Sequence, residues 1–327
     1  MPDKSGRDKK TSFVAANIAD VHFTLHAPAC RAPETNWLEY QGMILSQVFA
    51  ITAKYNVPLI IAGDIFTNWN PQHELVSWVI SRFRRSPTPI ICIPGNHDIP
   101  NHNYKQLPRS AFWTLVEAEA VTYLTPALHC THSFGPLIIS PFPFGFPVTH
   151  LQPGMSHDLC INVAVIHDYI WKPEHSVKEL ETEGSFIKAW RKKIKTYDVA
   201  IFGDNHKGFV SEKPGKTTII NCGSLMRTTI DQEDYMPFVT LLRLDGTTKI
   251  VYLDVESDLF ASIDDELNEI AIGLDVDIDE LIEDLRNAQG GQKRDLPKIV
   301  LSWARRENAP DYIIQILMRW LAGGRNG

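Results

Sequence analysis

The chain has 327 residues, of which 44% are hydrophobic and 22% are charged, and this balance excludes a largely disordered protein. Its length predicts one main domain and a smaller second one. The first ten residues are polar and basic, and no run of about 18 apolar residues occurs, so we expect neither an export signal nor a membrane span. The five cysteines are an odd number without close pairs, which favours a reducing cytoplasmic location.

The net charge of −7 arises from one acidic segment. Residues 1–253 are near neutral, with 24 Lys and Arg against 23 Asp and Glu. Residues 254–284 carry 13 acidic side chains and no Lys or Arg, whereas residues 285–327 carry eight basic and three acidic side chains. Because local patches decide whether a protein binds phosphates, the overall acidity does not exclude a nucleic-acid partner.

Short apolar runs rich in β-branched residues predict buried strands at residues 13–18, 57–62, 90–93, 137–139, 162–166, 199–202 and 217–220. Apolar residues at helical spacing predict helices at residues 37–55, 74–83, 110–120 and 186–195. Strands that alternate with helices indicate an α/β fold. Residues 141–157, rich in Pro, Phe and Gly, are expected to form a long irregular loop.

Five short polar motifs follow predicted strands at their carboxyl ends. They are Asp20-x-His22, Gly63-Asp64, Gly95-Asn96-His97-Asp98, His167 and Gly203-Asp204-Asn205-His206. In open α/β sheets this edge is where ligands bind, so side chains far apart in the sequence can converge on one crevice. Histidine, aspartate and asparagine donors without cysteine favour divalent ions such as Mn²⁺, Fe²⁺ or Zn²⁺, and Mn²⁺ is our first choice.

Two such ions about 3.5 to 4 Å apart can bind the attacking and leaving oxygens of a phosphoester and provide a hydroxide nucleophile at neutral pH. A bridging carboxylate must hold the two cations together, and Asp64, which follows a glycine, is the natural candidate. We expect His97 to protonate or stabilise the leaving oxygen, and its neighbour Asp98 to orient the His97 ring. An alternative for Asp98 is to cap the segment that follows it.

The motif series resembles that of the calcineurin-like metallophosphoesterase family, whose pattern is DxH, GD, GNHD, a lone H and then GHxH. Four of the five motifs match, and the resemblance spans roughly residues 12–250. It implies a sandwich of two β-sheets flanked by helices, and His97 as the catalytic histidine. It also implies one metal bound by Asp20, His22 and His206, a bridge at Asp64, and a second metal bound by Asn96 and His167.

The fifth motif departs from the family pattern, because Asp204 stands where the family usually has histidine. If the Asp204 carboxylate binds the second metal, that site becomes harder and more negative, which favours Mn²⁺ or Mg²⁺ over Zn²⁺. If the carboxylate turns away, the second metal is held weakly.

The residues that flank the motifs narrow the resemblance. The runs GNHDIPNHN, GDNHKGF and NCGSLMR are similar to those of phage and prophage relatives of the SbcD nuclease subunit. This resemblance implies a Mn²⁺-dependent exo- and endonuclease that acts on DNA ends, forms homodimers and pairs with an SbcC-like coiled-coil ATPase. We therefore expect a catalytic domain at residues 12–253 and, at residues 254–327, an acidic segment and a small helical module that docks the ATPase.

Several residues beside the motifs are candidates for contact with a nucleic-acid backbone or with bases, or are ordinary surface residues: His102, Tyr169, Trp171, Lys207, Phe209 and Arg227. The basic residues of 188–195 are interpreted as the solvated face of a helix whose Ile187, Trp190 and Ile194 point inward. The tripeptide at 215–217, Gly-Lys-Thr, lacks the earlier glycine of a Walker phosphate loop, so we expect no ATPase site there.

Two other functions stay open on the sequence alone. A phosphatase or a small-nucleotide phosphodiesterase would use the same motifs, and turnover of small phosphodiesters without DNA binding would identify it. A non-catalytic scaffold would keep the fold and usually lose metal ligands, whereas only Asp204 departs from the pattern here.

Overall fold

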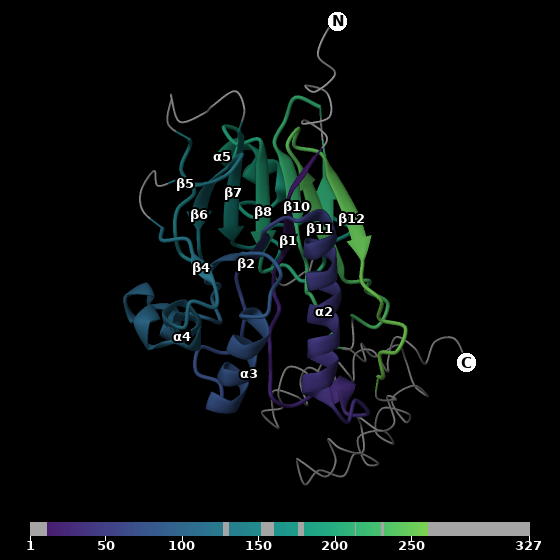
Figure 1. The fold of residues 1–327 in the computed structure, drawn as a ribbon. Helices are drawn as coiled ribbons and strands as arrows, with labels where there is room; N and C mark the ends of the chain where they lie inside the picture. Colours follow the sequence, from purple (N-terminus) through teal and green to yellow (C-terminus); the bar gives the residue numbers. More distant parts are fainter. Residues whose placement is uncertain are drawn as a thin grey trace, which may run out of the picture. The chain divides into compact units, whose positions relative to one another are not determined.

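A computed structural model describes residues 12–126, 131–151, 160–175, 180–212, 214–229 and 232–260 (Figure 1). The chain divides into two compact units. The first draws on Met1–His26, Asn36–Arg227 and Asp234–Ser257, and the second on Ala27–Thr35, Thr228–Glu233 and residues from Asp258 onward. Both sheets and every predicted site residue belong to the first unit. No helix in the described ranges is long and apolar enough to cross a membrane.

The first sheet has six strands in the order β12-β11-β1-β2-β3-β4. Strands β1, β2, β3 and β4 run parallel, whereas β11 and β12 add an antiparallel edge. The strand bounds are β1 Phe13–Ile18, β2 Leu59–Ala62, β3 Ile90–Ile93, β4 Thr122–Tyr123, β11 Phe238–Arg243 and β12 Thr248–Tyr252.

The second sheet also has six strands, in the order β5-β6-β7-β8-β10-β9. Strands β6, β7, β8 and β10 are parallel, and β5 and β9 pair antiparallel at the two edges. The bounds are β5 His132–Phe134, β6 Leu137–Phe142, β7 Ile161–His167, β8 Val199–Gly203, β9 Phe209–Ser211 and β10 Thr218–Asn221. In each sheet, therefore, the carboxyl ends of the central parallel strands share one edge.

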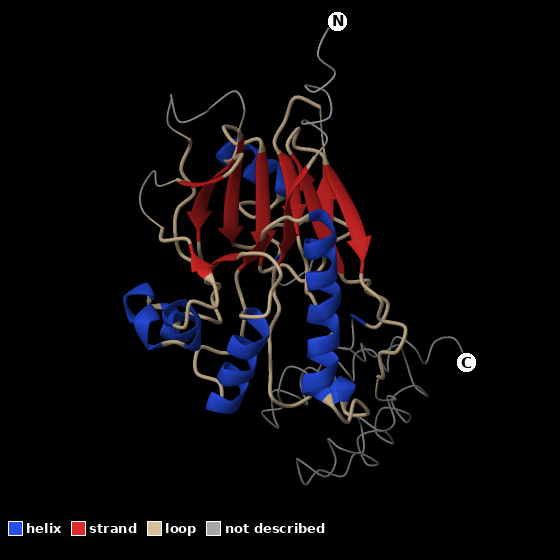
Figure 2. Ribbon diagram, in the orientation of Figure 1, coloured by secondary structure: helices blue, strands red, loops and turns tan. Residues whose placement is uncertain are grey.

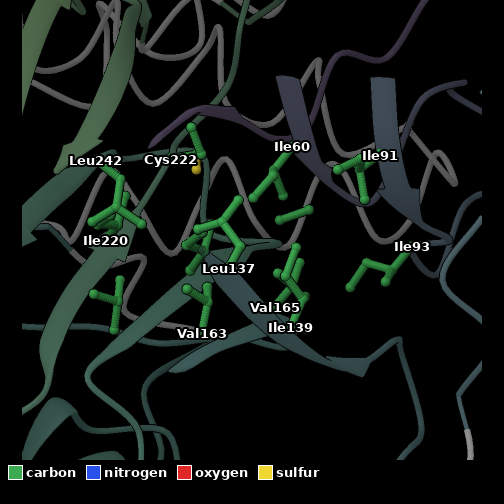
Figure 3. Packing of buried hydrophobic residues seen from close by; sticks show 14 of the residues in the cluster. Ile60, Ile91, Ile93, Leu137, Ile139, Val163, Val165, Ile220, Cys222 and Leu242 are labelled. Carbon is green, nitrogen blue, oxygen red and sulfur yellow. The ribbon is translucent and has the colours of Figure 1, made fainter. Parts of the chain in front are cut away.

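The core lies between the two sheets. Successive residues of a strand point to opposite faces, so Val163 and Val165 of β7 enter the central cluster whereas Ala164 and Ile166 face outward. Side chains of both sheets meet in this cluster, as Figure 3 shows for Ile60, Ile91, Ile93, Leu137, Ile139, Val163 and Val165. The apolar runs of the sequence are buried on both faces, which explains why they lack polar alternation.

Helices flank the sandwich (Figure 2). Helix α2 begins after Asn36, whose side chain accepts a hydrogen bond from the Glu39 amide, and ends at Asn56 in a left-handed conformation. Trp190 of helix α5 and Ile194, which follows the helix, pack on the outward-facing residues of β7 and β8. The helix bounds are η1 Ala29–Arg31, α2 Trp37–Tyr55, α3 His73–Phe83, η2 Pro100–His102, η3 Tyr104–Arg109, α4 Ala111–Glu117 and α5 Ile187–Lys193.

The predicted fold class, two β-sheets flanked by helices, is confirmed. Strands β1 and β3 and helix α2 have the predicted bounds. The sequence analysis misses five strands that lie at or next to the sheet edges, where short or half-exposed runs give a weak apolar signal: β4, β5, β9, β11 and β12. Strand β6 extends into the predicted loop, of which residues 152–157 lie outside the described residues. Most of the predicted module at 254–327 lies outside them as well.

Candidate metal centre

The polar residues that follow the parallel strands adopt a left-handed backbone conformation. The φ angles are 47° at Asp20, 50° at His22, 52° at Asp64 and 92° at Asp204. Non-glycine residues avoid this region, and each instance costs on the order of 1–3 kcal/mol. Four such residues at one edge show that the surrounding structure forces the chain to turn there, which points the side chains into a common space.

Three glycines that precede predicted ligand residues allow this close approach. A Cβ atom at Gly63 would lie 2.1 Å from Nδ1 of His167, and one at Gly95 would lie 2.1 Å from Oδ1 of Asp64. A Cβ at Gly203 would lie 2.3 Å from the carbonyl oxygen of Ala62. The glycine of each motif therefore makes room for a side chain or backbone atom brought there by another strand.

Asp20, His22 and His206 form one group of ligand atoms, all within 4.8 Å of one another. Nε2 of His22 lies 3.0 Å from Nε2 of His206. Nδ1 of His22 is buried and finds no hydrogen-bond partner among the described residues. Burial lowers the pKa of His22 to about 3, so its ring is neutral and can donate a lone pair to a metal.

Asp20, Asp64 and His167 form a second group of the same span. Oδ2 of Asp64 lies 3.6 Å from Nε2 of His22 and 3.5 Å from Nε2 of His167. Asp64 thus lies between histidines that belong to different groups, and Asp20 belongs to both groups. This arrangement places two carboxylates where two cations could share them.

His167 is oriented by a hydrogen bond to the backbone. Its Nδ1 donates to the carbonyl oxygen of Ala62 at 2.7 Å, while its Nε2 lies 2.9 Å from Oδ1 of Asn96. A metal-binding histidine usually donates its second ring nitrogen in this way, which fixes the tautomer and leaves Nε2 for the metal. Asn96 and His167, from different strands, therefore present an oxygen and a nitrogen to the same point.

The electrostatics of the site require added positive charge. Asp20 is fully buried and Asp64 is 1% exposed, and no lysine or arginine within the described ranges forms an ion pair with either. Burial raises the pKa of Asp20 well above its usual range, with the charge of His167 opposing the rise and that of Asp64 adding to it. Two adjacent buried carboxylates with histidine and amide donors fit a pair of divalent ions.

The charges of neighbouring groups also shift the pKa values of Asp64 and His167. Despite burial, which opposes ionisation, the charge and hydrogen bond of His167 hold the pKa of Asp64 below its usual range. Burial alone would lower the pKa of His167, but the charges of Asp64 and Asp20 raise it well above its usual range. A proton on His167 and a bound cation thus compete for the same negative charge.

His97 lies at the exposed side of the site. Its side chain is 45% exposed, and its Nε2 lies 4.0 Å from Oδ2 of Asp64. Its Nδ1 donates to the carbonyl oxygen of Thr67 at 2.7 Å, and its backbone amide donates to Oδ1 of Asp64 at 2.9 Å. The ring is therefore oriented by Thr67, and Nε2 faces the solvent-accessible part of the site.

Asp98 does not orient the His97 ring as we expected. Its buried carboxylate accepts backbone hydrogen bonds from Gly95 at 3.0 Å, Ile65 at 3.2 Å and Phe66 at 3.3 Å. Burial raises the pKa of Asp98 to about 7, and the charge of Asp64 adds to the rise while the three amides oppose it. Asp98 fixes the loops that carry Asp64 and His97, and these three bonds are not a cap of the segment that follows it, because all three amides precede Asp98 in the chain.

Asp204 enters the site through its backbone. Its amide donates to both carboxylate oxygens of Asp20, at 3.0 and 3.1 Å, which links the end of β8 to the end of β1. Its side chain is half-buried, and burial raises its pKa, with the charge of His167 opposing. The carboxylate belongs to neither ligand group. Its role as a metal ligand stays a prediction.

Three aromatic candidates for substrate contact are held by internal contacts. Tyr169 is 8% exposed, and its carbonyl accepts a hydrogen bond from the Trp190 ring. The ring nitrogen of Trp171 donates to the carbonyl oxygen of Thr182 at 3.0 Å. Phe209 is 3% exposed in the outer core. These positions favour packing, with Trp171 the most accessible of the three.

The three polar candidates for substrate contact differ in exposure. His102 is exposed, has φ of 54°, and its ring lies 5.2 Å from that of Phe144. Lys207 is half-buried next to His206, a predicted ligand. Arg227 is 8% exposed and donates to the carbonyl oxygen of Val255 at 2.8 Å, an arrangement that favours a structural role. His102 and Lys207 are more accessible than Arg227, and their contact with a substrate stays a prediction.

Sequence reasoning missed the structural roles of several residues at the site. The carbonyl groups of Ala62 and Thr67 orient the two histidines, and nothing in a sequence marks a carbonyl acceptor. The buried side chain of Asn205 donates to the carbonyl oxygens of Ile170 and His175, which holds the last motif in place. The glycines before the ligands were read as motif letters, although their repetition at three strand ends was a signal for close packing.

Comparison with known proteins identifies the family of the chain. A family model described as calcineurin-like phosphoesterase matches residues 15–314. No curated protein matches the chain. Similar solved structures include a dimetal phosphatase from Danio rerio, with 10% identity, a TM-score of 0.45, and coverage of 75% of this chain and 100% of that one. Another is the protein TT1561 of Thermus thermophilus, with 10% identity, a TM-score of 0.42, and coverage of 74% and 99%. The chain therefore belongs to the calcineurin-like phosphoesterase family, whose members use divalent metal ions.

Proposed function

We propose that the protein is a Mn²⁺-dependent DNA nuclease that hydrolyses phosphodiester bonds at DNA ends. The observation that carries the hydrolase part is the convergence of two ligand groups on Asp20 and Asp64, with exposed His97 at 4.0 Å. The similarity of the flanking runs to SbcD relatives supports the choice of DNA. An exposed histidine beside buried ligands also suits a long substrate that lies across the site rather than inside it.

Different residues of the site would bind the two metal ions. Asp20, His22 and His206 would hold one ion, and the residues that would hold the other are Asp64, Asn96 and His167, with Asp204 as an added ligand. When bound, the two ions supply positive charge that polarises the phosphate and lowers the pKa of water. Asp64 would lie between the two ions, because its carboxylate accepts a hydrogen bond from the His97 amide and lies 3.6 Å from His22 and 3.5 Å from His167.

His97 is placed to give a proton to the leaving oxygen. Because its Nδ1 donates to Thr67, the ring presents Nε2 on the side of the ligand groups. An imidazole can give up a proton during the reaction and regain it from solvent. The exposure of the ring keeps that exchange open.

Incubation with linear, hairpin and circular DNA in Mn²⁺ tests the proposal. We expect cleavage of substrates with ends, by the chain alone or together with a partner ATPase. Wild-type protein that loads metal but leaves all three substrates intact in both settings contradicts the nuclease proposal.

The same experiment separates the alternatives. Turnover of bis(p-nitrophenyl) phosphate or of cyclic nucleotides without DNA binding would identify a small-substrate phosphodiesterase or phosphatase. Failure to bind any metal, by elemental analysis of protein dialysed against Mn²⁺, would identify a scaffold that retains only the fold.

The partners are further proposals. We propose that two copies associate and that residues 254–327 dock an SbcC-like ATPase, because this segment separates 13 acidic side chains from a basic end, a pattern suited to protein contact. Light scattering of the purified chain measures the first, and co-purification with the ATPase measures the second. A monomer at micromolar concentration contradicts the dimer.

A further inference from the structure

A basic pocket lies away from the metal centre, on the outer side of the second sheet. It has a volume of about 350 Å³ and is lined by Lys188, Arg191, Lys192, Lys195, Gly215, Lys216 and Thr217. Its walls come from helix α5 with the residues that follow it and from the turn that precedes β10. Five of its seven lining residues are cationic and none of them is acidic.

The arrangement changes the interpretation of the basic residues at 188–195. Trp190 and Ile194 do point inward, into the cluster beneath α5. The cationic side chains on the other face, however, do not simply face solvent, because Lys216 from a different segment joins them around one hollow. The tripeptide at 215–217 thus contributes to a cationic hollow without being a Walker loop.

One cationic side chain of the pocket is held by hydrogen bonds to the fold, whereas its lysine side chains are exposed. Arg191 donates to the carbonyl oxygen of Thr217 at 3.0 Å and to Oγ of Ser211 at 2.9 Å, which joins α5 to the strands beside it. Lys188, Lys192, Lys195 and Lys216 are exposed. Long lysine stems can move their ammonium groups to suit a ligand.

The nearest acidic residues along the chain are used elsewhere. The Asp198 carboxylate accepts hydrogen bonds from the amide and the side chain of Asn162, at 2.8 and 3.0 Å. The Glu212 carboxylate accepts one from the amide of Thr248 at 2.8 Å. Neither lines the pocket, so its cationic side chains share a space without a carboxylate. Such a single-sign cluster attracts anions with several charges.

We propose that this pocket binds the phosphodiester backbone of nucleic acid. The choice of nucleic acid over other polyanions rests on the proposed function. The strands supply the reason to prefer a polymer: β8 and β10 are parallel, the pocket lies where they begin, and the metal ligands follow where β8 ends. In Figure 1 the arrows of β7 and β8 point away from α5. Five residues of strand span about 16 Å, so a ligand that reaches both places is longer than a nucleotide.

The binding mode follows from the lining residues. Lysines contact phosphates without reading base edges, so the pocket holds the substrate without adding sequence preference. DNA carries one charge per about 1.7 Å of duplex axis, so five or so base pairs would cover the span from pocket to metal centre. The pocket therefore acts on affinity for long substrates and leaves the chemistry of the bound phosphodiester unchanged.

Fluorescence anisotropy with a labelled duplex of about 20 base pairs, in chelator so that no cleavage occurs, tests the proposal. The variant K192Q/K216Q removes two exposed pocket charges. The matched control R84Q/R85Q removes two exposed charges that follow helix α3. Each lost phosphate contact reduces the slope of log affinity against log salt by about 0.9, so we expect the pocket variant to bind about tenfold more weakly at low salt, with a slope smaller by about 2.

The outcomes are distinct. A weaker and less salt-dependent K192Q/K216Q beside an unchanged control supports the pocket. Equal losses in both variants would mean that only net charge matters, and no loss in either, or no DNA binding by the wild type, would overturn the proposal. Hydrolysis of bis(p-nitrophenyl) phosphate should stay unchanged in both variants. If the wild type binds DNA through the pocket but does not cleave it, the nuclease proposal fails and the pocket proposal stands. The two proposals can therefore fail separately.

Discussion

The two ends of strand β8 differ in the sign of their charged side chains and in how firmly those side chains are held. At its carboxyl end, buried carboxylates and histidines are fixed by positive φ angles, glycine contacts and backbone carbonyls. Near its beginning, exposed lysines on flexible stems surround an open hollow. The comparison teaches that a site for small cations needs atoms fixed to a fraction of an ångström, whereas a site for a polymeric anion needs only a concentration of charge.

The largest expected effect is at the buried end. Asp64→Asn keeps the shape of the side chain and removes the charge between the two ligand groups. We expect a loss of about 10⁴ in the rate of phosphodiester hydrolysis, which corresponds to about 5.5 kcal/mol. Rates are compared with metal content measured on the same samples. Activity within tenfold of wild type would show that Asp64 does not hold the metals.

His97→Gln should separate proton donation from metal binding. We expect a loss of about 10³ in DNA cleavage with unchanged metal content, because His97 belongs to neither ligand group. Hydrolysis of bis(p-nitrophenyl) phosphate should fall much less, since its leaving group needs no proton. An equal loss on both substrates would contradict the role of His97 as proton donor.

Gly63→Ala tests whether the buried end depends on close packing. The added methyl would meet Nδ1 of His167 at 2.1 Å, and we expect a loss of about 10² in rate together with about 1–3 kcal/mol of stability. Gly145→Ala is the matched control, because Gly145 also has a positive φ, of 83° against 95°, but nothing lies within 4 Å of its added Cβ. Activity and urea unfolding are measured for both. Similar rate losses in the two variants would mean that backbone strain, rather than the contact with His167, is responsible.

The smallest effect concerns pH. The pKa values of Asp20 and Asp204 are raised by burial, so protons compete with metal at these carboxyls to a higher pH than usual. A raised folded-state pKa adds stability at low pH that is lost as pH rises through it, so these two groups destabilise the metal-free protein at higher pH. We therefore expect the rise in Tm caused by Mn²⁺ over chelator to grow from about pH 5.5 to pH 8. A Tm shift that does not change with pH would contradict this coupling.

The sequence predicted the parts of the site that depend on residue type and position. Ligand residues after buried strands converge because parallel strands end at one edge, which is a rule of topology. It could not show that Asp98 bonds to three amides rather than to its neighbour, because amide positions depend on how loops fold. The basic pocket could not be predicted from the sequence for a similar reason. Lys192 and Lys216 lie far apart in the sequence, and the pairing of β8 with β10 brings their segments together.

The hydrogen bonds from the Asp204 amide to both oxygens of Asp20 have a practical consequence. One N–H group joins the two sheets through a carboxylate that a metal would also engage. When an ion draws electron density from that carboxylate, the amide proton should shift in an NMR spectrum, and its exchange with deuterium should slow as the two strand ends are held together. A single backbone resonance at position 204 would then report metal occupancy, with no need for a substrate.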